Sequence, residues 1–174
     1  MKKNIILILG IASALSMRAQ SSELNSNCDS NPPDFNTSSY EAISHKVNIE
    51  YDSIVVSKTK RICPEYITNL VVELQSGKLN DDYKALAIYL LGELHPCDTN
   101  SIEVLIKDID LTSTKHDPAD SFSFSRWKKY PAEEALVKIG KPVIEPILNH
   151  LPKETSELRR QLMCDVLKQV LRSK

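Results

Sequence analysis

Apolar residues recur at helical spacing along most of the chain after residue 63, and prolines and glycines divide the runs. The stripe between Pro64 and Gly77 is typical of an amphipathic helix, with proline in its first turn and glycine after its last. Similar patterns predict six helices in this part of the chain, at about 64–76, 81–95, 98–109, 131–140, 142–151 and 154–172. Only a few residues join the first two helices, so we expect them to pack antiparallel.

Two periodicities compete between residues 40 and 59. Tyr40, Ile43 and Val47 keep the spacing of a helix, whereas Val47 and Ile49 alternate as residues of a strand would. Because every element predicted downstream is helical, we interpret this segment as a helix as well.

One short pattern occurs twice, as AIYLLG at 87–92 and as ALVKIG at 135–140. Each copy closes a helical run, so we expect Gly92 and Gly140 to end their helices at equivalent points. Such a pattern is typical of stacked helical hairpins, in which each hairpin needs its neighbours to bury its apolar face. The predicted fold is therefore all-α, a short right-handed α-solenoid of about three antiparallel hairpins.

These segments resemble the short bacterial HEAT-like repeats of the phycobilisome-lyase type. The resemblance rests on YKALAI at 83–88 leading to LGEL at 91–94, and on PAEEALVKIGKPVIEPIL at 131–148. It covers about 64–172 and implies an array of antiparallel helix pairs that serves in protein contacts. The repeat motif consists of packing residues, so the resemblance implies no lyase chemistry.

The first 19 residues have the features of a secretory signal peptide. Lys2 and Lys3 precede an apolar run at 5–15, and the small residues that end at Ala19 provide a cleavage site. The run is shorter than the about 20 apolar residues of a membrane-spanning helix, and no longer one follows. We therefore expect an exported protein, periplasmic or secreted, without membrane insertion after cleavage.

Cleavage after residue 19 would remove three positive charges and no acid, so the formal charge would change from −1 to −4. A negative balance disfavours nucleic acid as a partner. The remaining chain is long enough to fold as one domain without a metal. Residues 20–39 are rich in Ser, Asn, Pro and Asp, and we expect a flexible linker there, followed by the HEAT-like helical-repeat domain at 40–174.

Four cysteines, Cys28, Cys63, Cys97 and Cys164, permit two disulfides in an oxidising compartment, with three possible connectivities. Cys63 precedes and Cys97 follows the antiparallel pair at 64–95. Both should therefore lie at one open end of this pair, where a disulfide between them would clamp it. This interpretation leaves Cys28 to pair with Cys164, and the alternative is free, partly buried thiols.

The polar segment at about 110–130 is longer than the two to eight residues that usually connect packed helices. It combines aromatic residues, including the chain's one Trp and two of its three Phe, with basic ones, and the candidate partner-binding set is Phe122, Phe124, Arg126, Trp127, Lys128 and Lys129. In one interpretation these residues anchor a partner. In the other, which we favour, the aromatic residues, including Trp127, fold back over the hairpin ends while the basic side chains stay solvated.

No residue set has the spacing of a catalytic or metal site. His45, His95, His116 and His150 are scattered, and no two of them have the i, i+4 spacing of a helical zinc pair. We therefore expect a non-catalytic scaffold that binds a protein or peptide partner and needs no cofactor. The alternative is a small accessory hydrolase or another enzyme whose site is assembled from dispersed residues.

Overall fold

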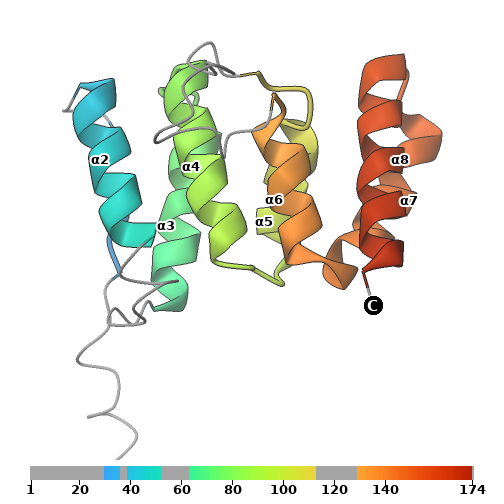
Figure 1. The fold of residues 1–174 in the computed structure, drawn as a ribbon, viewed down its shortest axis with the longest axis horizontal. Coiled ribbons are helices and arrows are strands. Elements are labelled where there is room, and N and C mark those ends of the chain that lie inside the picture. Colours follow the sequence, from blue (N-terminus) through green and yellow to red (C-terminus); the bar gives the residue numbers. More distant parts are fainter. Residues whose placement is uncertain (1–29, 36–38, 52–62, 113–128, 174) are drawn as a thin grey trace, which may run out of the picture.

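The computed structural model describes residues 30–35, 39–51, 63–112 and 129–173, and every regular element in these ranges is helical (Figure 1). The α-helices are α2 (Tyr40–Tyr51), α3 (Pro64–Gln75), α4 (Asp81–Glu93), α5 (Thr99–Lys107), α6 (Pro131–Ile139), α7 (Ile144–His150) and α8 (Glu157–Arg172). Two short 3-10 helices, η2 (Lys141–Val143) and η3 (Leu151–Lys153), flank α7. The predicted all-α class is confirmed for this part of the chain, in which no helix is long and apolar enough to span a membrane.

Capping residues set several helix boundaries. The side chains that cap helices are Asn80 for α4, Asp98 for α5 and Ser156 for α8. Each accepts a hydrogen bond from the backbone amide three residues later, which satisfies a donor that the first helical turn leaves open. Pro64 and Pro131 begin α3 and α6, where a missing amide hydrogen costs nothing.

The structure refines three of the predicted helices. The ambiguous segment at 40–59 is helical over Tyr40–Tyr51, and its remaining residues lie outside the described ranges. The single helix predicted at 142–151 is instead divided among η2, α7 and η3. The last helix begins at Glu157 and not at 154, because Ser156 provides the cap.

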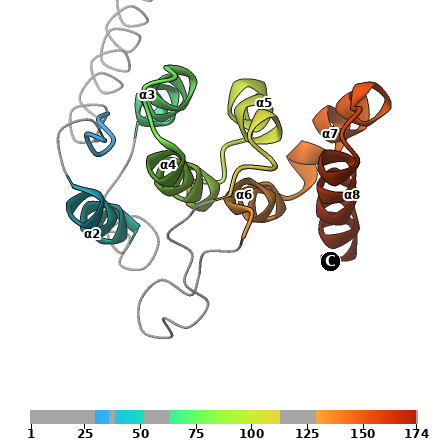
Figure 2. The ribbon, with the colours of Figure 1, turned by 90° about the horizontal axis from the view of Figure 1, so that it is seen from above.

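The helices lie in two rows, which are visible when the molecule is seen from above (Figure 2). One row contains α3, α5 and α7, and the other contains α2, α4, α6 and α8. The helices of the second row all run in the same direction, from top to bottom in Figure 1. Neighbours within a row and across the rows are in contact, and the most extensive contact joins α4 to α6.

The central helix of this arrangement is α4, which contacts α2, α3 and α6. Every residue from Ala85 to Gly92 is buried, so this helix is apolar on all sides after its first turn. Phe35 also belongs to the core, with 1% of its surface exposed. The stretch at 30–35, which we expected to be part of a flexible linker, therefore packs against the helices.

The two glycines of the repeated pattern have different roles. Gly140 follows α6 with a φ of 80°, a left-handed conformation that glycine adopts without strain. Gly92 was expected to end its helix in the same way, but it lies inside the last turn of α4. A Cβ atom on Gly92 would lie 2.7 Å from the Cβ and 2.8 Å from the Cα of Ala135 in α6. Its role is thus to let two helix backbones approach closely.

We expect Gly92→Ala to lower the free energy of unfolding by about 1–3 kcal/mol, because the added methyl group must push α4 and α6 apart. Urea unfolding followed by circular dichroism measures this change. Gly77→Ala is the control, since a Cβ at Gly77 meets nothing within 4 Å and only its positive φ of 71° opposes the change. A Gly92→Ala protein as stable as the wild type, or more stable through the better helix propensity of alanine, would contradict the close contact.

Candidate functional site

Several side-chain contacts in the described chain join neighbouring helices of the same row. In the second row they are the stacked rings of Tyr40 and Tyr83, the ion pair of Glu93 and Lys138, and the hydrogen bond from Gln169 to Glu133. In the first row Glu103 of α5 meets His150 of α7, with 2.7 Å between Oε2 and Nε2. The strongest candidates for a site are therefore clusters at helix interfaces.

The largest cluster between α4 and α6 centres on Lys138. Its ammonium pairs with Glu93, lies 3.1 Å from Oε1 of Glu134 and sits 4.9 Å from the ring centroid of Tyr89. The side chain of Glu93 is only 8% exposed. Burial lowers the pKa of Lys138, but the hydrogen bond to Glu93 and the charges of both carboxylates outweigh it and leave this pKa above its ordinary value.

His95 connects the end of α4 to the same region. Its φ of 47° places it in the left-handed region, which is uncommon for a residue with a side chain. Its Nδ1 atom donates a hydrogen bond to the carbonyl oxygen of Lys138 at 2.7 Å. This carbonyl lies in the last turn of α6, where helix carbonyls lack partners, so the imidazole caps the neighbouring helix.

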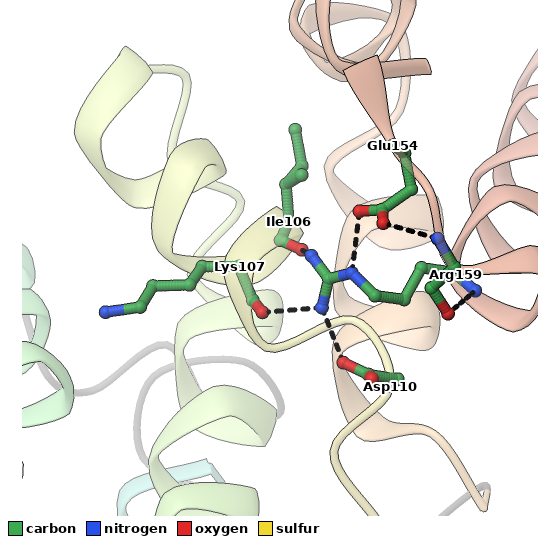
Figure 3. A network of polar contacts seen from close by, with 6 residues as sticks. Ile106, Lys107, Asp110, Glu154 and Arg159 are labelled. Carbon is green, nitrogen blue, oxygen red and sulfur yellow. Dashed lines mark hydrogen bonds and ion pairs between the residues drawn. The ribbon is translucent and has the colours of Figure 1, made fainter. Parts of the chain in front are cut away.

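A second cluster surrounds Arg159 near the start of α8 (Figure 3). Its Nε donates to Oε2 of Glu154 at 2.8 Å, and Nη1 donates to Oδ1 of Asp110 at 2.5 Å. Nη1 and Nη2 also donate to the backbone carbonyls of Lys107 and Ile106, at 2.9 and 3.1 Å. The hydrogen bond from Arg159 is the main cause that lowers the pKa of Glu154.

The Arg159 cluster fastens α5 to α8. Ile106 and Lys107 lie in the last turn of α5, so the guanidinium caps that helix while it pairs with both acids. This capping accompanies the end of α5 at Lys107, two residues before the predicted end. Four of the five guanidinium donors are used within the protein, which suits a cross-link better than the capture of an external anion.

Each cluster joins one cation to two carboxylates, so its formal net charge is −1. Glu93 and Glu134 pair with Lys138, and Asp110 and Glu154 pair with Arg159. In the described ranges no three His, Cys, Asp or Glu side chains are grouped to hold a metal ion. The geometry of these clusters supports a role in holding neighbouring helices together.

Of the predicted partner-binding residues, only Lys129 lies within the described ranges. It is exposed, and its Nζ atom lies 5.2 Å from the ring centroid of Tyr130, the residue that precedes α6. Phe122, Phe124, Arg126, Trp127 and Lys128 lie outside those ranges. The prediction for the segment as a whole therefore stays untested.

The predicted disulfides are wrong. Cys97 is exposed and Cys164 is half-buried, and both carry free thiols. The connection that contains Cys97 leads sideways from α4 to α5 and away from α3 (Figure 2). The Sγ atom of Cys97 lies 3.7 Å from the carbonyl oxygen of His95. Neither the Cys63–Cys97 bond nor the Cys28–Cys164 bond is therefore present. Cys63, at the N-cap of α3, is disulfide-bonded, and Cys28 lies outside the described ranges.

Comparison with known proteins does not assign the chain to a family. No protein-family model, curated protein or solved structure matches this chain. The HEAT-like resemblance therefore stays a hypothesis that rests on the sequence pattern alone.

We expect Lys138→Met to lower the free energy of unfolding by about 1–2 kcal/mol at pH 7, because it leaves the nearly buried Glu93 without its partner. The effect stays this small because Lys138 is partly exposed, so solvent screens its attraction to Glu93. The folded-state pKa of Lys138 is raised, so its contribution is complete below the ordinary lysine value of about 10.5 and is lost as the pH rises through the folded value.

Urea unfolding of the wild type and of Lys138→Met at pH 7 and pH 11 measures the loss of stability and its pH dependence. The difference in the free energy of unfolding between these two proteins should be smaller at pH 11. Lys168→Met is the matched control, because Lys168 pairs with Asp165 on the exposed side of α8. It should leave the unfolding midpoint unchanged. Equal effects of the two substitutions would show that the Glu93–Lys138 contact does not stabilise the α4–α6 interface.

Proposed function

We propose that this protein is an exported, non-catalytic helical-repeat scaffold that binds a protein or peptide partner. The observation that carries the proposal is the arrangement of the helices in two rows with extensive contacts along each row. In this interpretation the hairpins α3–α4, α5–α6 and α7–α8 form a short right-handed α-solenoid. Such arrays offer extended outer surfaces on which other molecules dock.

The polar contacts within each row support a rigid scaffold. Glu93–Lys138 and Glu133–Gln169 hold consecutive helices of the second row at a fixed spacing, and Glu103–His150 does the same in the first row. Rigid surfaces bind partners with less loss of conformational freedom than mobile ones. These side chains would have to leave their present partners before they could act on a substrate. Their pairing within the protein therefore favours a binding role.

The candidate partner-binding site is the segment that joins α5 to α6; because we expect its aromatic residues to fold back over the hairpin ends, we assign the partner contact to its basic residues. Its basic residues Arg126, Lys128 and Lys129 form a local positive charge on a chain that is negative after the proposed cleavage. The exposed ammonium of Lys129 supports this choice. A partner of complementary chemistry is a protein or peptide that presents acidic side chains, because charge complementarity guides association and selects partners.

We expect the triple substitution Arg126→Glu, Lys128→Glu and Lys129→Glu to abolish capture of the partner while the circular dichroism spectrum stays unchanged. Charge reversal at the rim of an interface slows association and repels an acidic partner. The measurement is affinity capture from the exported fraction of the native host, with the captured protein identified by mass spectrometry. The bait is the processed chain, for which N-terminal sequencing should give Gln20 as the first residue.

The matched control is Arg160→Glu, Lys168→Glu and Arg172→Glu, which makes the same change in net charge on exposed residues of α8. This control should keep the partner. Equal loss in both triple variants would indicate a response to overall charge, and equal retention would exclude the segment between α5 and α6 as the site.

A further inference from the structure

We infer that Cys63 is joined to Cys28 by a disulfide that closes the N-terminal end of the helical array. The chain has four cysteines. Cys63 is disulfide-bonded, whereas Cys97 and Cys164 have free thiols. Within one chain the remaining partner for Cys63 is Cys28. This inference does not depend on what the protein binds.

Ser30, two residues after Cys28, is held against the helix that begins after Cys63. Nδ2 of Asn69 in α3 donates a hydrogen bond to the carbonyl oxygen of Ser30 at 2.8 Å. Asn69 lies six residues after Cys63, about 9 Å along the helix axis. Cys28 lies two residues before Ser30, a span of up to about 7 Å. A disulfide joins Cα atoms about 5.5–6 Å apart, so the bond is within reach.

The segment at 30–35 lies between α2 and α3. Asn31, Pro32 and Pro33 line a shallow hollow together with Lys46 and Ile49 of α2. Phe35 is buried in the core. A bond from Cys28 to Cys63 would therefore enclose both this segment and α2 in one covalent loop, whose two ends meet at the start of α3.

The covalent loop would stabilise α2, the helix that it encloses. This helix lies at the end of the second row, where a helix has a neighbour in its row on one side only (Figure 2). Ile43 and Val47 are its fully buried apolar residues among those whose side chains are described. A disulfide stabilises such a segment mainly by restricting the unfolded chain.

The chemistry of closure is thiol–disulfide exchange. One cysteine thiolate attacks a disulfide oxidant and displaces one of its thiolates, and the second cysteine then attacks the mixed disulfide. The two cysteines lose two protons and two electrons, and the oxidant disulfide is reduced to two thiols. A disulfide oxidant of an exporting compartment supplies this step in the cell, and glutathione disulfide supplies it in the test.

Tryptic mapping without reduction tests the pairing directly, because each cysteine falls in a different peptide. Cys28 lies in a peptide that ends at Lys46, Cys63 in 62–78, Cys97 in 85–107 and Cys164 in 161–168. The full chain is oxidised with glutathione disulfide, and its monomer is isolated on a non-reducing gel. We expect one cross-linked species that contains the Lys46-terminated peptide and 62–78, with Cys97 and Cys164 alkylated.

Two variants complete the test. Cys28→Ser should expose Cys63 to alkylation and lower the midpoint of thermal unfolding by about 5–10 °C. The matched control, Cys164→Ser, removes a free thiol and should leave the cross-linked peptide intact. Linkage of 62–78 to 85–107 or to 161–168 would overturn the inference. So would alkylation of Cys63 in the oxidised wild type.

Discussion

The close approach of α4 and α6 is the contact on which the rest of the arrangement depends. Gly92 has no side chain, so the backbone of α4 meets Ala135 of α6 at a distance that any larger residue would prevent. A long segment separates α5 from α6 in the sequence, and the packing of α6 against α4 places α6 next in the second row. Because α4 also contacts α2 and α3, this one interface joins the earlier helices to the later ones.

The two ends of the array are held by contacts other than apolar packing. At one end Asn69 fixes the backbone of Ser30, next to the proposed disulfide of Cys63. At the other end Arg159 binds the last turn of α5 and both Asp110 and Glu154 (Figure 3). A terminal helix has fewer neighbours than an internal one, so directional contacts take over part of the stabilisation. The ends of the array thus combine burial with polar or covalent ties, as the α4–α6 interface combines burial with the Glu93–Lys138 pair.

Local signals in the sequence predict the helices well, because they depend on neighbouring residues. The caps at Asn80 and Asp98 and the left-handed Gly140 follow from residue types and their position relative to an apolar stripe. Contacts between distant residues are less visible. Gly92 and Gly140 occupy the same place in a repeated pattern, yet one allows close packing and the other ends a helix.

The candidate site was harder to predict than the helices, for the same physical reason. The spacing of Glu134 and Lys138 indicates an ion pair within one helix, but only the packing of α4 on α6 brings Glu93 to it. The acceptors of Arg159 include two backbone carbonyls, which no residue type reveals. The disulfide prediction assumed that helices which end together place their cysteines together, and it neglected the sideways course of the connection that carries Cys97.

Native-state hydrogen exchange tests the central claim most directly, because it measures the free energy of opening for each helix separately. If the α4–α6 contact unites the array, amides of both helices should exchange slowest and with the same free energy, equal to that of global unfolding. Amides of α2 should open at lower free energy. Exchange of α4 and α6 as two units of different stability, with the greatest protection in α8, would contradict this account.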